Sequence, residues 1–220
     1  MTNLWREIKF LLQKELLLEW RLKYAIGGIL LYVVSTIFIV FSSFIRIPAQ
    51  VWNPIFWIII LFAAVNAVAK SFVQENGSRR LYYYSLVSPS AIFVSKILYN
   101  TLLISALSCL TFLLLSFIAD NPVKDYSLFF TAIGLGGIGF SVIFTFVSSI
   151  ASKASNSSTL MAIMSFPAVI PIIMTLIKIS ASALRLIQDT SVGKDIVILF
   201  SIDGILIAVT LILFPYLWRD

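Results

Sequence analysis

Long apolar stretches separated by short polar breaks dominate this chain. Six of them reach or approach the ~20 residues that cross a bilayer as a helix. They are Tyr24–Phe44, Val51–Ala69, Ile97–Ile118, Leu128–Ile150, Thr159–Ile177 and Ile196–Trp218. Because these stretches are apolar throughout, they predict six transmembrane helices and not the alternating strands of a barrel.

Residues Asn3–Lys23 have the different pattern of an amphipathic helix on a membrane surface. One face collects Leu4, Trp5, Ile8, Leu11, Leu12, Leu16, Leu18 and Leu22, and the opposite face Arg6, Lys9, Gln13, Lys14 and Arg21. Glu15 and Glu19 interrupt the apolar face. Either both carboxylates reach the headgroup edge, or they face basic residues of the inner loop, such as Arg79 or Arg80, or of a partner chain.

The composition agrees with the pattern. The 220 residues are 60% hydrophobic and 12% charged, with a mean hydropathy of +1.01, whereas a soluble domain carries roughly 25% charge. We therefore expect an all-α integral membrane protein in which residues 1–220 form one transmembrane domain in contact with lipid.

The distribution of Lys and Arg predicts the orientation. With both ends of the chain inside, the inner segments hold eleven of the 16 basic residues and the outer loops hold five. Basic residues concentrate on the cytoplasmic side, so both termini are expected there. The net charge of +6 follows from this bias and does not indicate a nucleic-acid partner.

The longest polar interruption within the membrane part, Lys70–Lys96, therefore lies in the cytoplasm, where a soluble partner could push it. The chain has no G-x-x-x-x-G-K-[ST] motif, no histidine, and a single cysteine, Cys109, inside the third span. These absences argue against an ATPase, a Ser–His enzyme and a Cys or His metal site. Energy for transport would have to come from an ion or from another subunit.

The run of Gly134, Gly136, Gly137 and Gly139 matches the letters of a dinucleotide-binding motif. It lies inside an uncharged apolar helix with no acidic residue for over 40 positions, so a nucleotide site is not expected. Small residues in a membrane helix let neighbouring backbones approach. We expect these glycines to pack helices.

Two features of the last spans leave alternatives open. Pro167 and Pro171 should kink the fifth span, either as a fixed bend or as a hinge. Asp203 lies a third of the way into the sixth span, where a carboxylate is costly unless paired, protonated or wet. It forms an ion pair with Lys178 or Lys194, reaches the membrane edge, or lines a cavity that contacts substrate.

Several segments resemble one known family. They are KELLLEWRLK at Lys14–Lys23, PIFW at Pro54–Trp57, SFVQEN through SP at Ser71–Pro89, GLGGIG at Gly134–Gly139 and SFPAVIP at Ser165–Pro171. In this order and spacing they resemble the membrane subunit of the cytochrome c maturation ABC transporter, also called haem exporter protein B. The resemblance covers roughly residues 8 to 215.

The resemblance implies a six-helix ABC-2-type permease in the bacterial inner membrane. Its partners would be a cytoplasmic ATP-binding subunit, a haem-handling membrane protein, a small helper subunit and a periplasmic haem chaperone, with a homodimer of this chain as the default. ATP hydrolysis by the partner would drive haem export or release of the loaded chaperone. No covalently bound cofactor is implied, and haem is a candidate cargo.

Candidate ATPase-coupling residues follow from the same resemblance. Glu15, Glu19 and Arg21 match the charged helix at the start of the family, and Glu75 matches its acid after the second span. Arg79 and Arg80 depart from the family's commoner pattern there, and we include them as candidates.

Two other functions stay open. One is an ABC-2 permease for another cargo, such as a lipid-linked glycan or a drug. The other is a stand-alone carrier or scaffold, which would be supported by ion-driven transport through the purified chain alone.

If Glu75 docks the ATPase, reversing its charge should uncouple ATP hydrolysis from function without removing the protein from the membrane. ATPase turnover and transport in the Glu75→Lys variant would measure this, and wild-type activity would exclude the role.

Overall fold

The computed structural model describes residues 4–21, 23–44, 47–69, 87–152, 157–187 and 191–219. Within these ranges the regular structure is helical throughout, as predicted. The helices are α1 (Leu4–Arg21), α2 (Lys23–Ser43), α3 (Ala49–Ala69), α5 (Pro89–Ile118), α6 (Tyr126–Ala151), α7 (Ser157–Ala183) and α8 (Val192–Arg219).

Length and apolar composition qualify five of the described helices to cross a membrane: α3, α5, α6, α7 and α8. Helix α2 adds a shorter apolar segment, Gly27–Ser43. These six helices correspond to the six predicted spans, and the prediction of an all-α membrane protein is confirmed.

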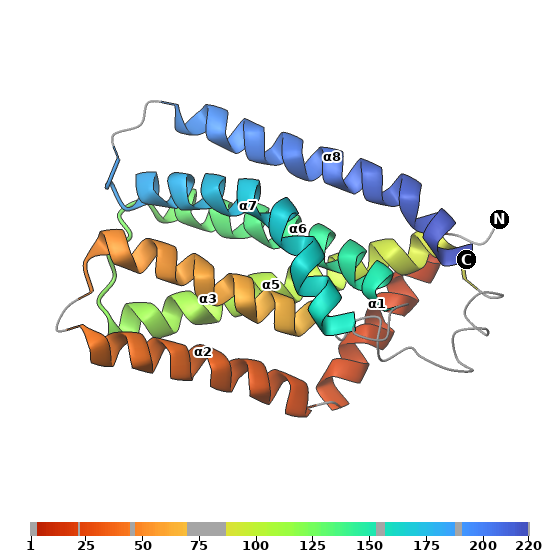
Figure 1. Ribbon diagram of the computed structural model, residues 1–220, viewed down its shortest axis with the longest axis horizontal. Helices are drawn as coiled ribbons and strands as arrows, with labels where there is room; N and C mark the ends of the chain where they lie inside the picture. Colours follow the sequence, from red (N-terminus) through yellow and green to blue (C-terminus); the bar gives the residue numbers. More distant parts are fainter. Residues whose placement is uncertain are drawn as a thin grey trace.

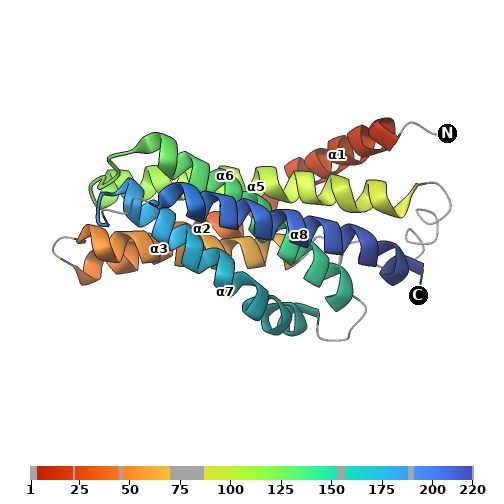
Figure 2. The ribbon, with the colours of Figure 1, turned by 90° about the horizontal axis from the view of Figure 1, so that it is seen from above.

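The six apolar helices run side by side along the long axis of the molecule, and α1 crosses them obliquely (Figures 1 and 2). Helix α1 begins, α5 begins and α8 ends at the same end of the bundle (Figure 1). We call this the terminal end. The last turn of α3 also points towards it (Figure 1).

Helix α6 occupies the centre of the bundle and contacts α3, α5, α7 and α8. Aromatic rings fill the space between α3 and its neighbours towards the end opposite the terminal end. Trp52 stacks on Phe56 with ring centroids 5.4 Å apart, and Phe129 of α6 lies 5.1 Å from Phe56 and 5.2 Å from Phe112 of α5. All four side chains are buried, and they hold α3, α5 and α6 together.

Three of the four glycines expected to pack helices lie at close approaches. A Cβ on Gly136 would come 2.9 Å from Leu176 of α7 and 3.0 Å from Trp57 of α3. A Cβ on Gly137 would come 2.6 Å from Ser105 of α5, and one on Gly139 would come 2.6 Å from Asp203 of α8. The missing side chains therefore let α6 approach four helices.

Gly134 differs from this expectation. A Cβ there would meet no described atom within 4 Å, because the neighbouring described helices do not reach this part of α6.

The third span begins eight residues earlier than predicted, at Pro89 instead of Ile97. Proline at the first turn of a helix suits the backbone, and Ala91, Ile92 and Phe93 are buried there against residues from α1 and α8. Because residues 89–96 include polar residues, the sequence pattern did not predict a helix there. This part of α5 is buried by contacts with other helices. The polar break between spans is shorter than Lys70–Lys96 for the same reason.

Helix α7 changes direction along its length (Figures 1 and 2) and contains Pro167 and Pro171. After the prolines, α7 is hydrogen-bonded to α3. Asn53 donates to the carbonyl of Ile177 at 2.9 Å, Trp57 donates to the Ser180 hydroxyl at 2.7 Å, and that hydroxyl lies 2.8 Å from the Asn53 carbonyl oxygen. Helix α7 therefore has a first half that begins towards the terminal end and a second half, after the prolines, that is hydrogen-bonded to α3.

Gly136 and Gly134 provide a matched pair of substitutions. Gly136→Leu should lower stability by about 1–3 kcal/mol, because overpacking displaces Leu176 or the hydrogen-bonded Trp57. Gly134→Leu has open space to enter and should leave stability near that of the wild type. Thermal denaturation in detergent micelles compares the two, and equal midpoints would show that α6 is not tightly packed at Gly136.

Candidate coupling site at the terminal end

The first contact between α1 and α5 joins a carboxylate to a helix start. The Glu7 carboxylate accepts hydrogen bonds from the Ser88 backbone N–H at 3.2 Å and from the Ser88 hydroxyl at 2.9 Å. Ser88 is the N-cap of α5. A negative charge at a helix N-terminus satisfies free N–H groups and opposes the positive end of the helix dipole, so Glu7 stabilises this first turn.

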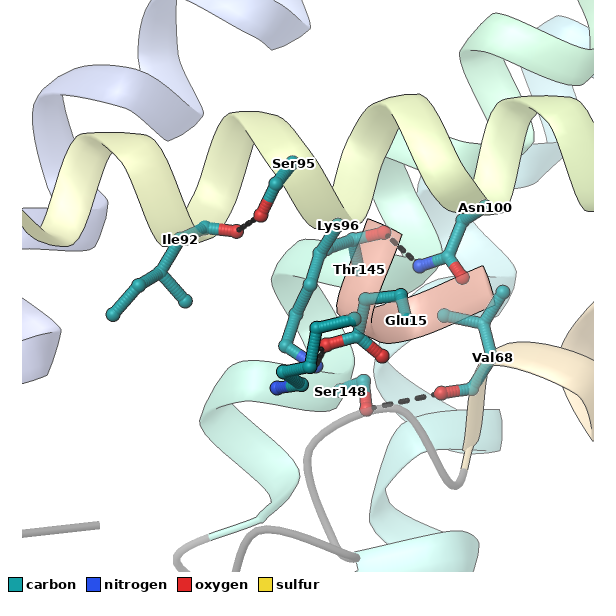
Figure 3. Close-up of polar contacts among 9 residues, drawn as sticks. Glu15, Val68, Ile92, Ser95, Lys96, Asn100, Thr145 and Ser148 are labelled. Atoms are coloured by element: carbon teal, nitrogen blue, oxygen red, sulfur yellow. Dashed lines mark hydrogen bonds and ion pairs between the residues drawn. The ribbon is translucent and has the colours of Figure 1, made fainter. Parts of the chain in front are cut away.

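The second contact is an ion pair. Lys96 of α5 extends towards α1, and its ammonium lies 3.4 Å from the Glu15 carboxylate (Figure 3). The side chain of Lys96 is 1% exposed and that of Glu15 is 14% exposed. Lys14 reaches the same Glu15 oxygen at 3.0 Å from a more exposed position. Because a buried ammonium without a counter-charge is strongly unfavourable, Lys96 requires the α1 carboxylate beside it.

The two contacts have the same spacing. Glu7 and Ser88 are 81 residues apart, as are Glu15 and Lys96. Helices α1 and α5 therefore run in the same direction at this contact and advance together by eight residues, about 12 Å. The Glu7–Ser88 and Glu15–Lys96 pairs therefore form in the same register of α1 against α5.

Apolar side chains fill the same contact and bring in α8. We call them the α1–α5–α8 cluster: Ile8, Leu11, Ala91, Ile92, Phe93 and Phe214. Phe93 stacks on Phe214 with ring centroids 4.5 Å apart. This cluster is separate from the main core, so the terminal ends of α1, α5 and α8 form a packed unit of their own.

Hydrogen bonds connect this unit to the centre of the bundle (Figure 3). The Asn100 amide donates to the Thr145 hydroxyl at 2.8 Å, which joins α5 to α6 one turn beyond Lys96. The Ser148 hydroxyl donates to the Val68 carbonyl at 3.3 Å, which joins α6 to the last turn of α3. The end of α3 and the start of α5, which flank segment 70–86, are thus both tied to α6.

The arrangement can transmit a displacement. Segment 70–86 leads directly into the first described residues before α5, and α5 is fixed to α1 by Glu7, Glu15 and the α1–α5–α8 cluster. Parting α1 from α5 would separate the Lys96 ammonium from the Glu15 carboxylate.

Of the predicted coupling residues, the structure places the side chain of Glu15. It faces a basic residue, as one interpretation expected, but that residue is Lys96. Glu75, Arg79 and Arg80 lie outside the described residues, and nothing is described of the side chains of Glu19 and Arg21.

Asp203 does not form the ion pair considered for it. Lys178 pairs instead with Asp195, at 2.9 Å, because both lie at the ends of their helices opposite the terminal end. Asp203 is eight residues, about 12 Å, further along α8, beyond the reach of that ammonium. It is 3% exposed, and within the described part of the chain neither carboxyl oxygen has a hydrogen-bond partner.

Sequence reasoning missed Glu7, Ser88 and Lys96 as members of this site. A signal was available: the acids on α1 and their partners on α5 both repeat after eight residues. This shared spacing can be interpreted only once α1 and α5 are known to be neighbours.

The long apolar helices and the amphipathic helix docked on them define a multi-pass membrane protein. Comparison with protein families identifies it further. The family described as CcmB protein matches residues 6–218, nearly the whole chain, and the chain belongs to this family. No curated protein and no solved structure matches the chain.

Members of the CcmB family are membrane components of the haem exporter ABC system for cytochrome c maturation. The family resemblance described from the sequence is therefore confirmed. The chain is a multi-pass membrane permease subunit, and its family implies an ATP-binding partner.

Removing the Glu15 carboxylate tests the buried ion pair. Glu15→Leu should destabilise the protein by about 3 kcal/mol, since it leaves the Lys96 ammonium buried without its counter-charge. Glu15→Leu combined with Lys96→Leu should recover much of that loss, because the unpaired charge is gone. Thermal denaturation of the single and double variants measures the coupling.

Lys14→Ala is the matched control, since it removes the more exposed cation from the same carboxylate and should cost at most about 1 kcal/mol. Additive effects of Glu15→Leu and Lys96→Leu would contradict the pairing.

Proposed function

We propose that this chain couples ATP hydrolysis by a cytoplasmic ABC subunit to haem export or to release of the haem-loaded periplasmic chaperone. The terminal end of the bundle faces the cytoplasm, and the ATPase acts there on segment 70–86 and α1. The observation that carries the proposal is the attachment of α1 to the start of α5 by Glu7 and Glu15, because it joins a surface helix to a membrane span.

The charge distribution supports this orientation. Eleven of the 16 basic residues belong to the segments predicted from the sequence to lie inside, the side expected to face the cytoplasm. All six candidate coupling residues belong to two parts of the chain: Glu15, Glu19 and Arg21 to α1, and Glu75, Arg79 and Arg80 to segment 70–86.

In the proposed cycle, closure of the ATPase displaces α1 and the start of α5 as one body. The Asn100–Thr145 and Ser148–Val68 hydrogen bonds pass the displacement to α6 and α3. Pro167 and Pro171 act as the hinge that lets the first half of α7 follow, while Asn53 and Trp57 hold its second half. The opposite end of the bundle then changes the surface that it presents to the chaperone.

The composition favours chaperone release over haem carriage through this chain. The sequence contains no histidine, the commonest axial ligand of haem iron in binding proteins. We propose that haem stays with partner proteins, which comprise a haem-handling membrane protein, a small helper subunit and the periplasmic chaperone. Two ATPase domains would act on two copies of this chain in the bacterial inner membrane.

Complementation of a deletion strain tests the function. Lys96→Glu places two acids together in the α1–α5 contact and should abolish covalent c-type cytochromes while b-type haem proteins persist. The charge-swapped Glu15→Lys, Lys96→Glu variant should restore part of the c-type signal, and Lys14→Ala should behave as wild type. Haem staining measures the cytochromes, and immunoblotting confirms that each variant reaches the membrane.

Normal c-type cytochromes in the deletion strain would contradict the proposed function and favour another cargo, such as a lipid-linked glycan or a drug. Normal c-type cytochromes with membrane-inserted Lys96→Glu would contradict only the role of the α1–α5 contact.

A further inference from the structure

Asp203 lies in a contact between three helices that the coupling site does not use. Its Oδ1 is 2.6 Å from the position that a Cβ on Gly139 of α6 would occupy, and Ile172 of α7 lies 2.9 Å from the same position. The carboxyl group therefore rests against the backbone of α6 where the missing side chain leaves room. It is 97% buried, since its exposed fraction is 3%.

No counter-charge approaches this carboxyl within the described residues. Helix α6 contains no Asp, Glu, Lys or Arg between Tyr126 and Ala151. The three helices with the main contacts on α8 carry few titratable groups: Lys96, Tyr99 and Cys109 on α5, Tyr126 on α6 and Lys178 on α7. Helix α8 itself carries Lys194, Asp195 and Tyr216, and α1 adds Arg6, Glu7, Lys9, Lys14 and Glu15 near Phe214 at the terminal end. Lys178 is engaged with Asp195 and Lys96 with Glu15.

The surroundings exclude most ligands of a carboxylate. A metal ion requires several oxygen ligands, and the described residues hold no cluster of three metal-ligating side chains. The neighbours Gly139 and Ile172 offer apolar atoms. An ionised carboxylate would be strongly unfavourable in such a place, whereas a protonated one carries no charge to compensate.

We propose that Asp203 is a proton-binding site, with its carboxyl group protonated while α8 is packed on α6 at Gly139. Packing and proton binding are then linked in both directions. Separation of α8 from α6 exposes the carboxyl to water and releases the proton, and ionisation in the packed state drives the two helices apart. The site is independent of the α1–α5 contact and holds even if the proposed cargo is wrong.

Infrared spectroscopy of the full-length protein in lipid nanodiscs tests the proposal. The wild type at neutral pH should show the carbonyl band of a protonated carboxylic acid, and Asp203→Asn should remove it. Asp195→Asn is the matched control, because Asp195 is paired with Lys178, and it should leave the band unchanged. A band region identical in the wild type and Asp203→Asn would overturn the proposal.

A second measurement uses stability. Raising the pH from about 5 to above neutral should lower the thermal midpoint of the wild type more than that of Asp203→Asn, because in this range Asp203 has already released its proton in the unfolded chain and still holds it in the packed one. Gly139→Ala should weaken the linkage by forcing the carboxyl away from α6. The same pH dependence in the wild type and Asp203→Asn would also overturn the proposal.

Discussion

A lysine buried at the terminal end of α5 constrains how this membrane protein is assembled. Lys96 is 1% exposed, and its ammonium lies 3.4 Å from the Glu15 carboxylate of α1. The amphipathic helix is thereby fixed to a span and does more than lie on the membrane surface. Glu7 at the α5 N-cap and the α1–α5–α8 cluster complete the contact, so a partner acting on α1 would also act on α5.

The centre of the bundle is built differently. The middle turns of helix α6 contain glycines that let Trp57, Ser105, Leu176 and Asp203 approach its backbone. The Ser141 hydroxyl adds a hydrogen bond to the Ile97 carbonyl of α5 at 2.7 Å. Since close packing transmits displacement instead of absorbing it, α6 links the terminal end to the rest of the bundle. Helix α7 changes direction along its length (Figure 1), and its second half is hydrogen-bonded to Asn53 and Trp57 of α3.

The apolar pattern predicted the helices well, because hydrophobic length is a local property of the sequence. The ends of α3 and α6 lie within two residues of the predicted ones. Local reasoning failed where a contact joins distant residues. It ended the polar break at Lys96 instead of Pro89, since the buried face of Ala91–Phe93 depends on α1 and α8. It singled out Glu15 and Asp203 correctly as unusual acids, but their surroundings are set by residues 81 and 64 positions away, Lys96 and Gly139.

The central claim is that α1 and the start of α5 move as one body when the ATPase acts. Spin labels at Lys9 on α1 and Leu98 on α5, both exposed, can be introduced after Cys109→Ala removes the one native cysteine. Pulsed electron paramagnetic resonance on the complex with its ATPase then measures their separation with and without trapped nucleotide. The account predicts that this distance stays constant while the distance from Leu98 to a label at Phe62 on α3 changes. A change in the Lys9–Leu98 distance on nucleotide binding would contradict it.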